Sequence, residues 1–173
     1  MKKGGTGGGR TVTGLRFESR VTLEKVLAVI PNYKVSNDIV YFKGKKVAEF
    51  YPKNKLYKNL LQPRNIDYSK IISKRLLPDE AILILKDQTL FIIEIKFQEV
   101  AGSVDEKLQT CDFKNKQYRK LLAPLNISVK YVYVLSDWFR NSAYKDVLNY
   151  VESVGCYYFF NELPMEFLGL PVR

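Results

Sequence analysis

Two apolar runs separated by a short polar break dominate the pattern in the middle of the chain. Residues 81–85 and 90–93 are wholly apolar, and Lys86-Asp87-Gln88-Thr89 lies between them. Apolar runs of this length joined by a few polar residues are typical of a β-hairpin. The sequence therefore predicts a hairpin between Pro78 and Lys96.

Three charged residues, Asp79, Glu94 and Lys96, lie near the open end of this hairpin. If Asp87-Gln88 forms a two-residue turn, Asp79 lies opposite Lys96 and Ala81 lies opposite Glu94. Side chains alternate faces along a strand, so the three charged residues share one face. The other face is apolar and is expected to pack into the core; it carries Ile82, Ile84, Phe91, Ile93 and Ile95.

The segments before the hairpin predict one helix and a second pair of strands. Apolar residues at helical spacing favour a helix over 14–30, with Thr13 as its N-cap. Residues 38–42 and 46–51 have the composition of short strands around a turn that contains glycine. Residues 53–64 are basic, with a tyrosine among the lysines, which favours a short helix that contacts solvent or nucleic acid.

The segments after the hairpin alternate between helix and strand. We expect a helix over 104–122, a buried strand over 128–135, a helix over 143–154 and a strand over 156–160. Strand–helix–strand units imply parallel strands, whereas the earlier hairpins imply antiparallel ones. The expected fold class is α/β, with a mixed central β-sheet flanked by helices.

Composition and charge narrow the range of possible functions. The 173 residues are enough for one domain, which we take as 1–173 with a glycine-rich N-terminal arm at 1–12. A formal net charge of +10 favours a polyanionic partner, most simply nucleic acid. The absence of histidine excludes histidine-based proton transfer and nucleophile activation. The two cysteines, Cys111 and Cys156, are expected to be buried thiols.

The chain carries no signal for a membrane or for export. No apolar run approaches the ~20 residues that a bilayer span needs. Met1 is followed by lysines and glycines rather than by an apolar segment, so the expected location is cytoplasmic.

The charged face of the hairpin is suited to a metal ion. Two carboxylates a few ångströms apart repel each other unless a cation neutralises them. A hard divalent cation such as Mg²⁺ prefers oxygen ligands, which Asp79, Glu94 and the backbone carbonyl of Ile95 would supply. Lys96 would then stabilise a pentavalent phosphate or orient an attacking water. The alternative is that Asp79 and Lys96 form a cross-strand ion pair with no catalytic role.

The hairpin also resembles the active-site motif of a nuclease superfamily. Pro78-Asp79 followed by Glu94-Ile95-Lys96 resembles the PD-(D/E)XK signature, and the expected αβββαβ order from 14 to 135 is similar to the core of that superfamily. The continuation from Gln98 to Leu108 resembles type II restriction endonucleases. The resemblance implies a restriction-endonuclease-like fold and Mg²⁺-dependent, sequence-specific cleavage of double-stranded DNA.

The resemblance also implies roles for individual residues. Asp79 and Glu94 would be metal ligands, and Lys96 would be the catalytic lysine. Glu18 matches the additional acid that many members of the superfamily carry on the first helix. Restriction enzymes of this kind usually act as homodimers on palindromic sites, and the host would be expected to carry a companion DNA methyltransferase.

Several polar residues are candidates for contacts with DNA. The resemblance implies that Gln98 and Lys107 position the backbone phosphate. Ser103, with Glu106 three residues later, forms a capping box at a helix start that could bind an anion. Base readout would fall to one of two polar clusters, which are Lys114, Asn115, Lys116, Gln117 and Arg119, or Trp138, Arg140 and Asn141. The alternative is that both clusters contact phosphates or form a solvated surface.

Two other functions remain open from the sequence. A junction resolvase, repair nuclease or homing enzyme could use the same fold and the same charged residues. A non-catalytic basic nucleic-acid-binding protein would keep these residues for structural reasons alone and would bind nucleic acid without metal.

Overall fold

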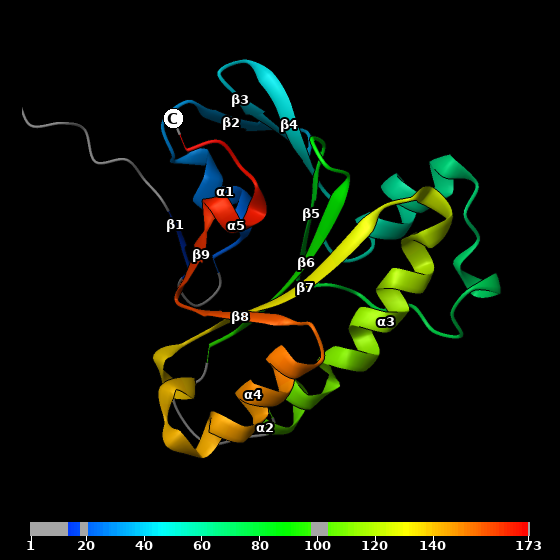
Figure 1. Ribbon diagram of the computed structural model, residues 1–173. Coiled ribbons are helices and arrows are strands. Elements are labelled where there is room, and N and C mark those ends of the chain that lie inside the picture. The colour runs from blue at the N-terminus through cyan, green and yellow to red at the C-terminus, as the bar shows by residue number, and fades with distance from the viewer. Residues whose placement is uncertain (1–13, 18–20, 98–103, 173) are drawn as a thin grey trace, which may run out of the picture.

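A seven-stranded mixed β-sheet forms the centre of the part of the chain that the structure describes (Figure 1). The computed structural model describes residues 14–17, 21–97 and 104–172. The strands lie side by side in chain order, and they are β2 (Tyr33–Ser36), β3 (Ile39–Phe42), β4 (Lys45–Phe50), β5 (Glu80–Ile84), β6 (Thr89–Lys96), β7 (Ser128–Leu135) and β8 (Tyr157–Phe160). A separate two-stranded sheet pairs β1 (Gly14–Arg16) with β9 (Glu162–Pro164).

The type of strand pairing changes once across the main sheet, from antiparallel to parallel. Neighbouring strands from β2 to β6 are antiparallel, whereas β6, β7 and β8 are parallel. The chain passes between the parallel strands through helices, which is the connection that parallel neighbours require. The helices are α1 (Leu23–Ala28), α2 (Val104–Lys107), α3 (Cys111–Leu122), α4 (Lys145–Ser153) and α5 (Met165–Leu168). The predicted α/β class and the mixed sheet flanked by helices are confirmed.

Helices and a π-helical segment (Leu56–Leu61) cover the two faces of the sheet with separate cores (Figure 1). Side chains from α3, α4 and the π-helical segment pack against Leu83 and Ile92 on one face. Side chains from α1 and α5 pack against Ile82 and Phe91 on the other face. The alternation of adjacent residues between the two cores follows from the period of two along a strand. Both cysteines are buried free thiols in the first core, as predicted.

The predicted turn of the central hairpin is wrong, but the predicted face is right. Thr89 pairs with Ile84, so the turn contains the four residues 85–88 rather than Asp87-Gln88 alone. Gln88 adopts a φ of 52°, and Oδ1 of Asp87 accepts a hydrogen bond from the Thr89 N–H at 3.2 Å. These local contacts stabilise the longer turn. The pairing shifts by two residues, and a shift of two keeps every side chain on its expected face.

The first predicted helix is wrong in its start. Leu15 and Phe17 are buried on either side of exposed Arg16, which is the alternation of a strand and not of a helix. Helix α1 begins only at Leu23, where Oγ1 of Thr22 accepts the N–H of Lys25 at 3.4 Å. Pairing of the 14–16 segment with β9, nearly 150 residues away, was not visible in the local pattern.

The predicted long helix over 104–122 is divided in two. A 3₁₀ turn at 108–110 separates α2 from α3. The carbonyl of Lys107 accepts hydrogen bonds from the side chains of Thr110, at 2.7 Å, and Tyr133, at 3.2 Å. Side-chain donors that compete for a helical carbonyl weaken the regular ladder at that point. Within the described ranges, no helix has the length and apolar character needed to cross a membrane.

The burial of β6 gives a stability prediction. Ile92 is fully buried, so Ile92→Ala should lower the free energy of unfolding by about 2–5 kcal/mol through lost burial and a cavity. Val29 is 82% exposed, so the control Val29→Ala should change it by less than about 0.5 kcal/mol. Urea denaturation followed by circular dichroism measures both values, and equal midpoints for the two variants would contradict the assigned burial.

Candidate active site

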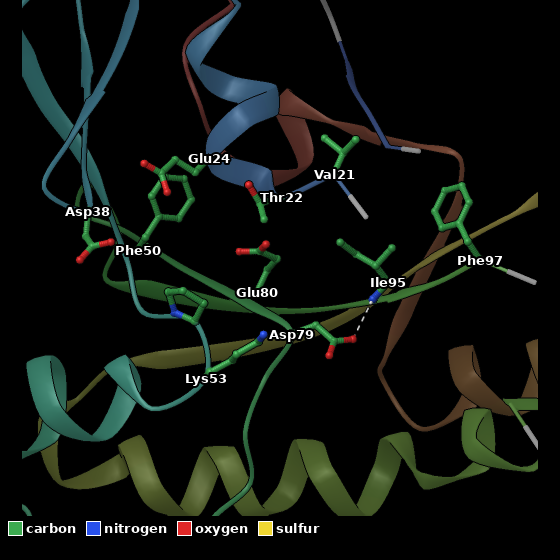
Figure 2. Close-up of a pocket in the computed structure, with 11 residues that line it drawn as sticks. Val21, Thr22, Glu24, Asp38, Phe50, Lys53, Asp79, Glu80, Ile95 and Phe97 are labelled. Carbon is green, nitrogen blue, oxygen red and sulfur yellow. Dashed lines mark hydrogen bonds between the residues drawn. The ribbon is translucent and has the colours of Figure 1, made fainter. Parts of the chain in front are cut away.

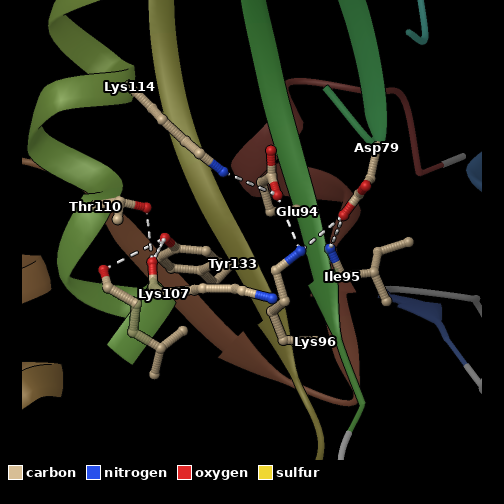
Figure 3. A network of polar contacts seen from close by, with 9 residues as sticks. Asp79, Glu94, Ile95, Lys96, Lys107, Thr110, Lys114 and Tyr133 are labelled. Atoms are coloured by element: carbon tan, nitrogen blue, oxygen red, sulfur yellow. Dashed lines mark hydrogen bonds and ion pairs between the residues drawn. The ribbon is translucent and has the colours of Figure 1, made fainter. Parts of the chain in front are cut away.

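Lys96 links the two acidic residues of the hairpin motif (Figure 3). Its Nζ lies 2.9 Å from Oδ2 of Asp79 and 2.9 Å from Oε2 of Glu94. Asp79 immediately precedes β5, whereas Glu94 and Lys96 lie near the end of β6. The structure therefore brings together the three residues that the sequence singled out, and it does so through one shared ammonium group.

The central position of β6 buries Glu94. This strand pairs with β5 on one side and β7 on the other, and Glu94 lies on the face that α3 covers. Its side chain is only 5% exposed, whereas that of Lys96 is 18% exposed and that of Asp79 is 45% exposed. A buried carboxylate is costly unless it is paired, so Lys96 has a structural reason to stay charged.

The backbone around Asp79 is held from both sides. The N–H of Ile95 donates to Oδ2 of Asp79 at 3.3 Å, and the N–H of Lys53 donates to the carbonyl of Pro78 at 2.9 Å. Upstream, the hydroxyl of Tyr57 accepts from the N–H of Leu76 and donates to its carbonyl, each at 2.9 Å. These contacts fix the Asp79 carboxylate just before the start of β5.

The environment of Lys96 acts on its pKa in two opposing ways. Burial lowers the pKa of the ammonium, but the charges and hydrogen bonds of Glu94 and Asp79 outweigh burial and raise it above the ordinary lysine value. Lys96 is therefore a cation at neutral pH in this arrangement. It can stabilise negative charge, but it cannot accept a proton while it bridges the two acids.

A second lysine reaches the same acid from α3. Nζ of Lys114 lies 3.4 Å from Oε2 of Glu94, and the Lys114 side chain is 28% exposed. Figure 3 shows it extending from the helix toward Glu94. The sequence placed Lys114 in a cluster for base readout, and the structure places it at the acidic site instead.

The donor set of this site fits a divalent cation. The Lys96 ammonium stands at equal distances from the two carboxylates, so the position between them already holds a positive charge. Oxygen ligands of this kind, completed by waters, suit Mg²⁺. No cluster of three or more carboxylate or thiol side chains suited to a metal occurs among the described residues. The ligand role of the Ile95 carbonyl remains a prediction, since the contact of Ile95 with Asp79 runs through its N–H.

A cleft of about 490 Å³ opens on the other side of Asp79 (Figure 2). Four acidic residues and Lys53 line it, the acids being Glu24, Asp38, Asp79 and Glu80. In Figure 2, Glu80 points toward Thr22 at the start of α1, whereas Asp79 turns toward Ile95. The sequence analysis missed Glu24, Glu80 and Lys53; the strand alternation does indicate that Glu80 faces away from Asp79.

Glu80 is the buried acid of this cleft, with only 7% of the residue exposed. Its Oε1 accepts the N–H of Leu23 at 3.4 Å. Burial raises its pKa to about 7; the Leu23 hydrogen bond opposes this effect, and the negative charges of Asp79 and Glu24 add to it. Glu80 is therefore partly protonated near neutral pH.

The proposed DNA-binding residues on α2 and α3 do not form one cluster. Lys116 is bound to Asp112 at 2.7 Å, and its side chain is 70% exposed. Arg119 is exposed, Gln117 is half-buried and the side chain of Lys107 is exposed. Asn115 is only 2% exposed, so the expectation that it reads bases is wrong.

The side chains of the second polar cluster, Trp138, Arg140 and Asn141, form hydrogen bonds within the protein. Oδ1 of Asn141 accepts the N–H of Ala143 at 2.9 Å and caps a 3₁₀ turn. Nε of Arg140 donates to Asp137 at 2.6 Å, and its guanidinium lies over the ring of Phe160. The indole N–H of Trp138 donates to the hydroxyl of Tyr144 at 2.6 Å. Arg140 retains an exposed side chain that could still contact a phosphate.

Three other predicted site residues, Glu18, Gln98 and Ser103, lie outside the described residues. Their proposed roles in metal and phosphate binding therefore remain predictions. Comparisons with known proteins add no relative: no family model, no curated protein and no solved structure matches the chain.

The raised pKa of Glu80 predicts a pH-dependent stability. Between pH 4.5, the ordinary value for glutamate, and about 7, the folded protein binds more protons at Glu80 than the unfolded chain. Stability therefore falls as pH rises through this range. Glu80→Gln, which keeps the shape and cannot ionise, should be about 3 kcal/mol more stable than the wild type at pH 8 and equal to it near pH 4.

Thermal and urea unfolding in EDTA at several pH values measures this difference. Glu24→Gln is the matched control, because Glu24 lines the same cleft but is exposed. The control should differ from the wild type far less than Glu80→Gln does, because it removes only the contribution of the Glu24 charge to the raised pKa of Glu80. A constant offset between Glu80→Gln and the wild type from pH 4 to 8 would contradict the assignment.

Proposed function

We propose that this protein is a Mg²⁺-dependent, sequence-specific endonuclease of double-stranded DNA, of the type II restriction kind. The observation that carries the proposal is the bridge of Lys96 between Asp79 and Glu94 at the edge of a buried sheet. The formal net charge of +10 supports a polyanionic substrate. The proposed reaction adds water to phosphorus and breaks one P–O ester bond, giving a phosphomonoester and a free hydroxyl.

The topology supports a restriction-endonuclease-like fold. The proposed catalytic motif lies on antiparallel β5 and β6, and the chain then passes through α2 and α3 to β7, which is parallel to β6. This order is the one implied by the sequence resemblance to PD-(D/E)XK nucleases. The resemblance rests on the same three residues as the observed bridge, and it supports the proposed chemistry by analogy.

Each residue of the motif has a distinct proposed role. Asp79 and Glu94, with the carbonyl of Ile95, would hold Mg²⁺, which supplies Lewis-acid activation of the phosphodiester and of the attacking water. The Ile95 N–H keeps Oδ2 of Asp79 in place at 3.3 Å. Lys96 stays protonated and stabilises the negative charge that develops on the phosphate.

Recognition of a palindrome would require two copies of the chain, so we propose a homodimer. Exposed basic side chains on α2 and α3, including Lys107 and Arg119, would contact the phosphate backbone. A host that carries this activity would need protection of its own DNA, for which a companion methyltransferase is the expected partner.

A cleavage assay tests the proposal. The wild-type protein, incubated with plasmid and phage DNA in Mg²⁺, should give discrete fragments whose sequenced ends share one short palindrome. Glu94→Ala and Lys96→Met should each lower the cleavage rate at least ~10²-fold, because they remove a metal ligand and the cation at the phosphate. Addition of EDTA should abolish cleavage.

Glu152→Ala is the matched control, because Glu152 is an exposed acid on α4. It should cut at the wild-type rate. Preferential cleavage of four-way junctions or flaps would identify the protein as a structure-specific nuclease and not as a restriction endonuclease. DNA binding without strand breaks in Mg²⁺ or Mn²⁺, at wild-type protein concentrations that saturate the DNA, would refute an endonuclease.

A further inference from the structure

Lys114 is the least expected member of the charged cluster around Glu94. It lies on α3, whose buried side chains Cys111, Asn115 and Tyr118 fix that helix against the sheet. The flank that carries Lys114 is half-buried, and its Nζ reaches Oε2 of Glu94 at 3.4 Å (Figure 3). The Lys114 side chain is only 28% exposed, so most of it is packed against the protein in this arrangement.

Both lysines contact the same carboxylate oxygen. Lys96 approaches Oε2 of Glu94 at 2.9 Å and also binds Asp79, whereas among the described residues Lys114 forms an ion pair with Glu94 only. Two carboxylates and two ammonium groups make this cluster electrically neutral. Lys96 occupies the position between the acids, so a divalent cation bound by both acids and the Lys96 ammonium compete for that position.

We propose that Lys114 is a positioning residue that keeps Glu94 paired and oriented when Lys96 leaves its bridging position. This inference rests on the proposed function, because it concerns how the same site takes up its divalent cation. The second part of the proposal is that the positive charge of Lys114 weakens binding of the divalent cation in the absence of DNA. A DNA phosphate at the site would offset that charge, so cation and DNA binding become coupled.

Electrostatics explains both parts of the proposal. Glu94 is 5% exposed, so loss of every cationic partner would leave a buried charge without compensation. Lys114 comes from a different element than Lys96 and can remain while Lys96 moves toward the phosphate. The positive charge of Lys114 beside the Glu94 carboxylate repels an incoming cation. The negative charge of bound DNA would offset this repulsion.

The test compares Lys114→Gln with Lys120→Gln. Both substitutions remove one lysine charge from α3, but Lys120 is exposed and belongs to neither the acidic site nor the predicted DNA contacts. Calorimetric titration of the DNA-free protein with Mn²⁺ should show about tenfold tighter binding for Lys114→Gln than for the wild type. The maximal plasmid cleavage rate at saturating Mg²⁺ should fall about tenfold, because the orientation of Glu94 is lost. Lys114→Arg should restore both values, and Lys120→Gln should match the wild type.

The outcomes separate this inference from the proposed function. If the wild type cleaves DNA and Lys114→Gln matches Lys120→Gln in Mn²⁺ affinity and in rate, the role of Lys114 is overturned alone. If nothing is cleaved but Lys114→Gln binds Mn²⁺ more tightly than Lys120→Gln, the proposed function fails and the role of Lys114 in the cation site is supported. If neither the wild type nor Lys114→Gln binds Mn²⁺, the role of Lys114 is overturned, and the cleavage assay alone decides the proposed function. Circular dichroism of each variant excludes unfolding as the cause.

Discussion

The burial of the Glu94 carboxylate in a central strand is the constraint on which the rest of the site depends. A charge that is 5% exposed needs partners, and the structure supplies an ammonium group from its own strand and another from α3. The first of these also reaches Asp79, so the neighbouring strand is drawn into the same cluster. Charged side chains from β6 and α3 therefore meet at a single oxygen atom, Oε2 of Glu94, and Lys96 extends the cluster to the start of β5.

The two faces of the sheet give adjacent acids different environments. Asp79 joins the paired charges on the α3 face, whereas Glu80 faces the start of α1 and has no lysine ion pair in the described structure. The difference follows only from the alternation of side chains along β5. One acid is paired with Lys96 and partly exposed, while the other is buried with a raised pKa. The same dipeptide thus combines a group suited to bind a cation with a group that burial keeps partly protonated.

The sequence was sufficient for the α/β class and for the shared face of Asp79, Glu94 and Lys96. The predicted face was correct although the predicted turn was wrong, because side chains alternate with a period of two and a shift of two residues in the pairing leaves each side chain on the same face. The exact pairing was not predictable, since the length of the turn depends on the conformation of Gln88 and on local hydrogen bonds. Lys114 could not be assigned to the site, because a helix pattern shows which flank is polar but not what lies beneath that flank. The start of α1 was missed because the partner of β1 is a distant strand.

The double hydrogen bond between the Tyr57 hydroxyl and the backbone of Leu76 has a consequence for how this protein can diversify. It closes the loop between the π-helical segment and the strand that begins after Asp79. Most residues from 62 to 75 are exposed. An insertion or deletion among them would leave the contact between Tyr57 and Leu76 in place, and Asp79 would therefore keep its position. Loops closed at their base in this way tolerate insertions at a modest entropic cost. New contacts with a substrate can therefore arise in this segment while the spacing of the charged cluster stays the same.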